Sequence, residues 1–390
     1  MRMKKIMSLA VAAIALVACT KTYEVVETSQ EQSPIGFGTW TDVLTKARTN
    51  GSTATSFANN EMFKVYGTKL VSSTSYQVFN GTDIKATVSE SVSWNYNNTA
   101  DVRYWDRAAT SYTFYAALPG SMVTAYGSLT DEQKTAITNT EYSFNGLFYG
   151  SFTFDDPTAI GNDVLVASEK TVTVIDENVR NAVQLEFNHI ASAVDLLAKK
   201  DAALASATVT VTGVKFKNIK KAGNFHVSAY STTPTVAWSG QTGVLETVAS
   251  SSIYSASIGG NKVVAAYSTY GTVDPEDANA VNTTTGDPVS LLSGYVFLPQ
   301  ELVAATQQIL LSYTIAVGEE QPSVYTDVPV DLRAFMTADH NDNGGGSAIT
   351  SWDPGKHYIY TITIGANAIT FTATVNNWSE TVNGYNYLTN

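Results

Sequence analysis

The chain has 390 residues, of which 15% are charged, with 23 basic against 35 acidic side chains and a formal net charge of −12. This acidic balance argues against nucleic acid or an anionic membrane surface as a partner, since both are bound through basic patches. A chain of this length can bury a sizeable core, and we expect about two domains.

The side-chain composition predicts an almost all-β protein. The chain holds 21 Tyr and 15 Phe, and Thr, Val and Ser are abundant. Aromatic and β-branched side chains pack well on a pleated sheet. We therefore expect strands to form nearly the whole fold.

The N-terminus has the pattern of a secretory signal. Basic Arg2, Lys4 and Lys5 precede an apolar stretch, residues 6–18, that is too short to span a bilayer as a helix. The stretch ends at Cys19, the only cysteine of the chain, which excludes an intramolecular disulfide. Leu16-Val17-Ala18-Cys19 resembles a lipobox, so we expect residues 1–18 to be a lipoprotein signal peptide and Cys19 to be acylated, which anchors the precursor to a membrane.

The next segment is predicted to hold a tether, a strand and a protease site. Residues 21–33 are polar and acidic, which is typical of a flexible tether. Ile35, Phe37 and Thr39 alternate on one face of a short predicted strand. Lys46 and Arg48 then precede a run of glycine and small hydroxylated residues, and proteases cut such exposed loops. Arg48, followed by Thr49, is the expected cleavage position, and a cut after Lys46 is the alternative. The other interpretation is that both are solvated charges in a linker.

The remaining chain reads as alternating strands separated by turns. The strands with the clearest period of two are residues 61–67, 111–118 and 308–317 and a hairpin over residues 357–378. A short helix is predicted over residues 128–137, where Thr130 and Gln133 have capping-box spacing. Strands at this spacing predict two tandem β-sandwich domains with little helix. We place the boundary between them at residue 181.

The sequence offers no positive sign of catalysis, a cofactor or a metal. Asp339 opens a stretch similar to a calcium loop, but position twelve is Thr350 where a glutamate is required, so a solvated glycine-rich turn is the default for residues 339–346. The histidines show no metal-ligand spacing, and His189 is expected to be a hydrogen-bonded structural residue. Motifs for nucleophilic or nucleotide-dependent catalysis are lacking. We expect a non-enzymatic protein without a cofactor.

A series of landmarks in chain order resembles a known family. They are the cysteine at residue 19, "IGF" at 35, "TKAR" ending at 48, "FKVYG", "YWDRAATSYTFYAALPG", "LEFNHIASAVDLL", "YVFLPQ", "WDPGKHYIYTITI" and "ITFTATVNNW". Together they resemble the fimbrillin, or Mfa-like, family of type V pilins and related surface proteins of Gram-negative anaerobes. The most specific of them is the pattern W-D-P-G-K-x-Y-x-Y, which starts at Trp352.

The resemblance implies a maturation step. In such pilins a lipidated precursor reaches the outer membrane, and an arginine-specific protease removes an N-terminal strand. A strand of a neighbouring pilin subunit then fills the vacated groove. Carried over here, residues 35–44 would be the removed strand, Arg48 would precede the cut and Thr49 would begin the mature chain. The implied parts are a tether and strand over 19–48 and two transthyretin-like sandwiches over 49–180 and 181–390.

The resemblance also implies a donor strand at the C-terminus, and the candidate is a short strand with Tyr385 and Tyr387 on one face and Val382 and Leu388 on the other. A frayed terminus is the other interpretation of these residues. We therefore carry two hypotheses: a pilus subunit that polymerises by strand exchange and serves adhesion, and a tip, accessory or non-polymerising surface lipoprotein that binds a host protein or glycan. Both place the protein at the outer membrane or cell surface.

Overall fold

The computed structural model describes residues 33–39, 59–88, 92–120, 124–125, 148–153, 163–175, 178–229, 235–242, 253–256, 262–263, 288–337, 347–366 and 369–377. Within these ranges the fold is all-β, as predicted. Helix is limited there to single 3-10 turns, which are η1 (Thr99–Asp101), η5 (Asn178–Arg180), η6 (Ala202–Leu204) and η7 (Leu332–Ala334). The helix expected over residues 128–137 lies outside the described residues.

One seven-stranded sheet, here called the N-terminal sheet, dominates the first part of the chain. Its order is β11-β8-β5-β2-β3-β4, with β9 also paired to β5. The strands are β2 (Met62–Val71), β3 (Thr74–Val88), β4 (Val92–Tyr96), β5 (Ser111–Leu118), β8 (Leu165–Ala167), β9 (Lys170–Thr173) and β11 (Phe187–His189). A separate two-stranded parallel sheet joins β1 (Phe37–Thr39) to β10 (Val183–Leu185).

The N-terminal sheet packs one face against a cluster of aromatic and aliphatic side chains, here called the N-terminal core. Phe63 and Val65 of β2 are fully buried in it, as their alternation predicted. The alternation expected for β5 fails in one respect, because Tyr115 and Ala117 are buried as well. Both belong to a second cluster on the opposite face of the sheet, so this end of the sheet is covered on both sides.

The C-terminal part is a sandwich of two five-stranded sheets. One has the order β18-β12-β24-β25-β22 and the other β16-β13-β20-β21, with β17 beside β13. The strands of the first sheet are β12 (Ser192–Lys200), β18 (Val289–Phe297), β22 (Met336–Thr337), β24 (Lys356–Ile364) and β25 (Ile369–Asn377). Those of the second are β13 (Ala207–Lys217), β16 (Ile253–Ala256), β17 (Lys262–Val263), β20 (Gln308–Val317) and β21 (Ser323–Asp331).

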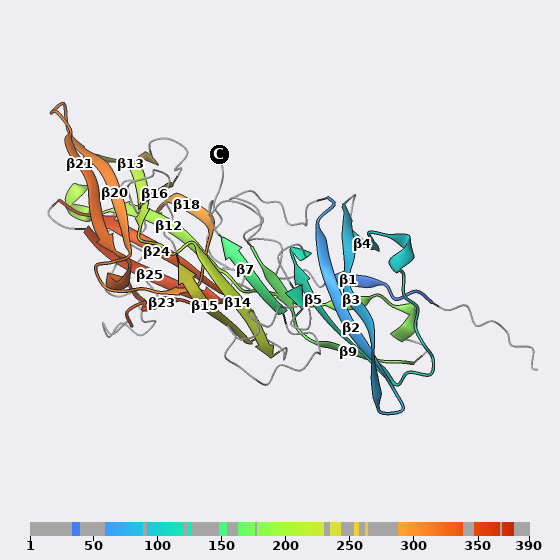
Figure 1. Ribbon diagram of the computed structural model, residues 1–390. Coiled ribbons are helices and arrows are strands. Elements are labelled where there is room, and N and C mark those ends of the chain that lie inside the picture. The colour runs from blue at the N-terminus through green and yellow to red at the C-terminus, as the bar shows by residue number, and fades with distance from the viewer. Residues whose placement is uncertain are drawn as a thin grey trace, which may run out of the picture.

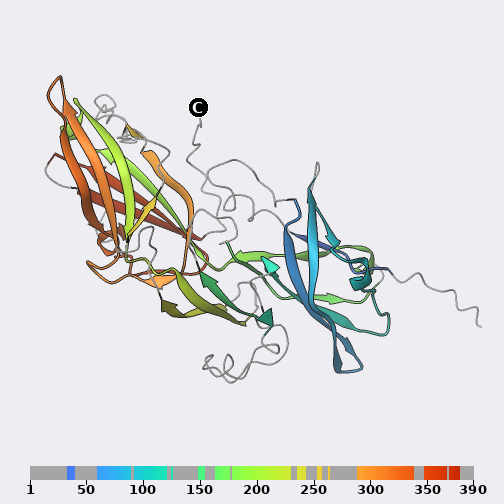
Figure 2. The same cartoon turned by 45° about the horizontal axis from the view of Figure 1, so that its top comes forward.

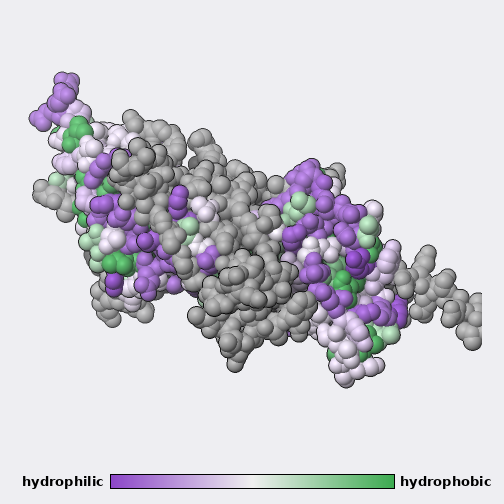
Figure 3. Space-filling model, viewed as in Figure 1, coloured by the Kyte–Doolittle hydropathy of each residue, from purple (hydrophilic) through white to green (hydrophobic). Residues whose placement is uncertain are grey.

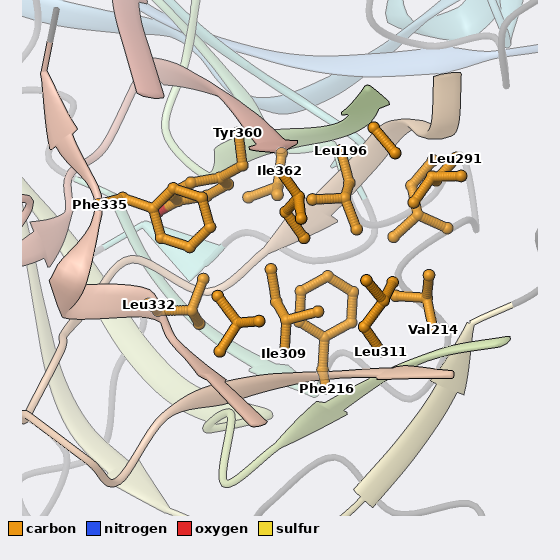
Figure 4. Packing of buried hydrophobic residues seen from close by; sticks show 14 of the residues in the cluster. Leu196, Val214, Phe216, Leu291, Ile309, Leu311, Leu332, Phe335, Tyr360 and Ile362 are labelled. Carbon is orange, nitrogen blue, oxygen red and sulfur yellow. The ribbon is translucent and has the colours of Figure 1, made fainter. Parts of the chain in front are cut away.

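The two sheets of the sandwich meet through their apolar faces. Figure 4 shows Leu196, Ile362 and Tyr360 from one sheet lying opposite Ile309 and Leu311 from the other. The hairpin predicted near the C-terminus is confirmed, since β24 pairs antiparallel with β25 along its whole length. Burial of alternate side chains from two facing sheets is what holds a β-sandwich together.

A four-stranded sheet, here called the junction sheet, combines strands from both parts of the chain. Its order is β15-β14-β7-β6, with β6 (Thr124–Ala125), β7 (Phe148–Thr153), β14 (Ala222–Ala229) and β15 (Thr235–Thr242). A small sheet pairs β19 (Gln300–Glu301) with β23 (Ser351–Trp352). Because β7 precedes residue 181 and β14 follows it, main-chain hydrogen bonds cross the predicted domain boundary, and N-terminal core residues extend to Phe187. The boundary at 181 stays a prediction.

The molecule is elongated. In both views the N-terminal sheet lies at one end and the sandwich at the other, with β7, β14 and β15 between them (Figures 1 and 2). On the face drawn in Figure 3, hydrophobic patches of the described residues are scattered among hydrophilic ones, and the end of the β20–β21 hairpin is hydrophilic. The large apolar side chains of these strands are mostly buried, in three clusters.

Candidate functional site

The first described segment, residues 33–39, is tied into the N-terminal part by its main chain. Trp105 donates its amide to the Ser33 carbonyl over 3.1 Å, and Ile35 donates its amide to the Arg103 carbonyl over 2.8 Å. Beyond this point the segment changes partner and β1 runs parallel to β10. The segment thus bridges two stretches that lie about eighty residues apart in the sequence.

Two side chains of this segment complete the N-terminal core. Ile35 is fully buried and Phe37 is 5% exposed. The ring of Phe37 meets four other aromatic rings edge-on or nearly so: those of Phe63 at 6.4 Å, Phe79 at 5.5 Å, Tyr96 at 6.3 Å and Phe114 at 5.7 Å between centroids. Edge-to-face pairs add to the free energy of burial. We call the space that Ile35 and Phe37 fill the first-strand slot.

Tyr96 fixes the position of the segment in this slot. Its hydroxyl donates a hydrogen bond to the Ile35 carbonyl over 2.7 Å and accepts one from the Arg103 amide over 3.5 Å. Burial raises the pKa of Tyr96 from 10.0 to about 12. The hydroxyl is therefore protonated, and able to donate, throughout the neutral range.

The residues that alternate with Ile35 and Phe37 are glycines, and they lie toward β10. A Cβ on Gly38 would come within 2.5 Å of the Gln184 amide, which is the far end of a flexible side chain, whereas a Cβ on Gly36 would only touch Ala182 at 3.8 Å. One face of the strand therefore places large side chains in the slot, and the other face, toward β10, has no side chains at residues 36 and 38.

The structure brings together only part of the predicted site. Ile35 and Phe37 lie in the first-strand slot, and the backbone of Thr39 pairs with Leu185. Other predicted positions lie outside the described residues: Cys19, Lys46, Arg48, Thr49, Val382, Tyr385, Tyr387, Leu388 and residues 339–346. Their predicted roles in lipidation, cleavage, strand donation and cation binding stay predictions.

Sequence reasoning missed the partners of the first strand. No sequence motif points to Tyr96 or Arg103, and the boundary predicted at residue 181 assigns Val183 and Leu185 to the following domain. The alternation of Val183 and Leu185 does signal a strand, with one buried face. The pattern does not reveal that this strand pairs with β1, because β1 and β10 lie far apart in the sequence and parallel pairing leaves no signal in either strand.

His189 and the other residue types that can bind a metal have structural surroundings in the described part of the chain. His189 is buried and its Nδ1 lies 2.8 Å from Oδ1 of Asp163, in agreement with a structural role. Among the described residues no group of three or more His, Cys, Asp or Glu side chains is arranged to hold a metal ion. No helix in the described ranges is long and apolar enough to cross a membrane.

Known proteins resemble this chain over most of its length. A family model described as fimbrillin-like matches residues 45–378. The crystal structure of a fimbrial protein from Bacteroides vulgatus is similar with a TM-score of 0.52 and 15% identity, covering 88% of this chain and 99% of that chain. The tip fimbrial protein Mfa3 from Porphyromonas gingivalis matches with a TM-score of 0.30 and 10% identity, over 82% of this chain and 95% of that chain. A search of curated protein sequences gives no match.

Proposed function

This chain belongs to the fimbrillin-like family, and from that membership we propose that it is a structural subunit of a type V pilus that serves cell adhesion. It is exported as a lipoprotein through Cys19, cut after Arg48 and assembled by strand exchange at the outer membrane or cell surface. Its partners are an arginine-specific protease and other pilin subunits. The observation that carries the proposal is the burial of Ile35 and Phe37 in a core to which the N-terminal sheet contributes most of the other side chains.

The position of the first strand in the chain supports cleavage as the switch. Residues 33–39 contact the core, while Lys46 and Arg48 follow them in a polar stretch. A cut after Arg48 leaves the strand held by non-covalent contacts alone. The first strand can then dissociate from the core, and it cannot be rejoined to the chain because the peptide bond has been hydrolysed.

The chemistry of the emptied slot supports capture of another strand. Departure of residues 33–39 would expose the rings that surround Phe37 and would leave the Arg103 carbonyl and the Val183 amide without their present partners. Unpaired main-chain groups beside an apolar cleft are a template for strand addition. The captured strand needs two large apolar side chains two residues apart, because that is the spacing of Ile35 and Phe37.

The alternative is a tip or accessory subunit, or a surface lipoprotein that binds a host protein or glycan without polymerising. Such a protein would accept a strand and donate none. The two functions differ in the C-terminal residues Val382, Tyr385, Tyr387 and Leu388, which would supply the donor strand in a polymerising subunit.

Limited proteolysis tests the proposal. The Cys19→Ser precursor is treated with an arginine-specific protease, the product is identified by intact mass, and assembly is followed on native gels. We expect one product that begins at Thr49 and then forms ladders. Arg48→Gln should block the cut and the ladders, while Lys46→Gln should leave both unchanged. A clean cut without ladders would favour the tip or accessory subunit, and resistance at Arg48 would overturn the maturation scheme.

A further inference from the structure

Residues 189–192 connect the N-terminal sheet to the sandwich, and their N-terminal side is held by the first part of the chain. His189 Nδ1 lies 2.8 Å from Asp163 Oδ1, and both side chains are 1% exposed. The Ile190 amide donates to the Val164 carbonyl over 3.0 Å. The connection therefore begins as a fixed extension of the N-terminal sheet.

The other side of the connection is held by a turn from the sandwich, residues 352–355. The Gly355 amide donates to the Ala191 carbonyl over 2.8 Å, and the Ser192 hydroxyl donates to the Asp353 carbonyl over 2.9 Å. Hydrogen bonds that are mostly shielded from water hold a connection in one conformation more firmly than exposed ones.

The turn is itself anchored in the sandwich. Trp352 donates its Nε1–H to the hydroxyl of Tyr360 over 2.7 Å, and its ring stacks on Phe297 with the centroids 5.0 Å apart. The amide of Asp353 donates to the hydroxyl of Tyr358, also over 2.7 Å. Trp352, Tyr358 and Tyr360 are at most 2% exposed. The turn therefore cannot shift without disturbing the core of the sandwich.

Gly355 is the closest point of contact between the turn and the connection. Its φ is +68°, which favours glycine, and a Cβ at this position would lie 2.8 Å from the carbonyl oxygen of His189. That oxygen belongs to the main chain, so it has no flexible end that could move aside. Any larger residue here must push the turn away from the connection.

Two further features join the same parts. The Trp238 Nε1–H of β15 donates to the Ile190 carbonyl over 2.9 Å, and β14 pairs with β7 within the junction sheet. Around them lies an apolar cluster drawn from both parts of the chain: Tyr66, Tyr115, Ala117, Val164, Val166, Ile190, Ala191, Ala193, Phe225, Val227, Val296 and Leu298.

We infer that the turn 352–355 acts as a strap that locks residues 189–192, so that the N-terminal sheet and the sandwich form one rigid rod. Parts of a chain joined by a short connection usually move relative to each other unless the interface between them is large and hydrophobic. Here a buried cluster, a shared sheet and bonds to three successive residues of the connection oppose that motion. The inference stands without the proposed function.

The strap has a consequence in a fibre, which does rest on the proposed function. If subunits join through the N-terminal part of one and the C-terminus of another, tension passes through residues 189–192 in every subunit. A locked connection keeps the subunits aligned, whereas a hinge there would let the fibre bend at each repeat.

Distance measurements between spin labels test the strap. The full chain carrying Cys19→Ser is labelled at Thr87→Cys on β3 and Val303→Cys in the sandwich part, both exposed positions, and the distance distribution is measured by double electron–electron resonance. We expect a single narrow distribution that Gly355→Ala broadens or splits. A broad distribution in the parent protein would overturn the inference.

Gly318→Ala is the matched control. Gly318 also lies in the sandwich part and has a φ of +57°, but nothing lies within 4 Å of an added Cβ. Both substitutions carry the backbone cost of alanine at positive φ, and only Gly355→Ala presses on the connection. If the distance distributions of Gly355→Ala and Gly318→Ala were equally wide, the turn would not be what locks the connection.

A second variant covers the case in which Gly355→Ala does not fold. Ser192→Ala keeps a small side chain at this buried position but removes the hydrogen bond to the Asp353 carbonyl of the turn. Amide hydrogen exchange should then show faster exchange at residues 190–192 and 355, with the sandwich core unchanged. Unchanged protection at these amides would contradict the strap.

Discussion

At the scale of single residues, Phe37 and Tyr96 govern the first strand. Phe37 supplies the aromatic contacts and Tyr96 supplies a hydrogen bond to the strand's main chain. Both contributions are needed. Without the Tyr96 hydroxyl, the Ile35 carbonyl would lose this hydrogen bond in an apolar environment, which costs free energy.

Phe37→Ala should destabilise the uncut chain by about 3–5 kcal/mol, since it removes a buried ring and leaves a cavity among four others. Urea unfolding followed by tryptophan fluorescence measures the change. Tyr76→Ala is the control, because Tyr76 is 49% exposed and its loss should change the unfolding free energy by less than about 0.5 kcal/mol. Equal effects of the two substitutions would show that the slot contributes nothing to stability.

Tyr96→Phe should lower the unfolding free energy at neutral pH by about 1 kcal/mol through loss of the bond to Ile35. It should also change the pH dependence. The pKa of Tyr96 is raised from 10.0 to about 12 by burial, so its contribution is complete below pH 10 and is lost as the pH rises through 12. Unfolding of both proteins between pH 7 and 12 should show the advantage of the parent shrinking above pH 10, and a constant difference would contradict this.

At the scale of elements, β1 differs from the other strands. Among the described strands it pairs with the short β10 alone, in parallel, and the rest of its segment bonds to residues 103–105. The element is thus held mainly by its side chains and a few main-chain bonds, which is the arrangement expected of a strand that can be exchanged.

A chain that starts at Thr49 should bind a synthetic peptide of residues 33–39. At a peptide concentration of about 100 times Kd, binding should stabilise the truncated chain by about 2.7 kcal/mol. Thermal unfolding with increasing peptide measures the effect. The control peptide carries Ser in place of Ile35 and Phe37 and should leave Tm unchanged. Equal shifts with both peptides would mean that the slot does not select its occupant.

At the scale of the whole molecule, the groove and the donor of the proposed strand-exchange scheme belong to different parts of the chain. The first-strand slot lies in the N-terminal core, and β25, the last described strand, lies in the sandwich. Residues 378–390 directly follow β25. A subunit with the slot in one part and the donor on the other can form an open, head-to-tail chain.

Removal of residues 378–390 should therefore leave cleavage after Arg48 intact and abolish the ladders on native gels. Removal of Thr389 and Asn390 alone is the control and should leave the ladders unchanged. A mixture of the cut chain that lacks residues 378–390 with the uncut precursor should give no polymer, because the first has no donor strand and the second has no open slot. Ladders that persist without residues 378–390 would place the donor strand elsewhere in the chain.

The sequence by itself determined the fold class and several strands of this protein, because aromatic and β-branched composition and a period of two are local properties. It also singled out Ile35 and Phe37 as one face of a strand. Only the tertiary structure decided what that face meets, since Tyr96, Arg103 and Val183 are brought to it by pairings across long stretches of chain. The tertiary structure also decided that β5 is buried on both faces and that the junction sheet joins strands from both sides of residue 181. Contacts between distant segments leave no periodic pattern in the sequence of either segment.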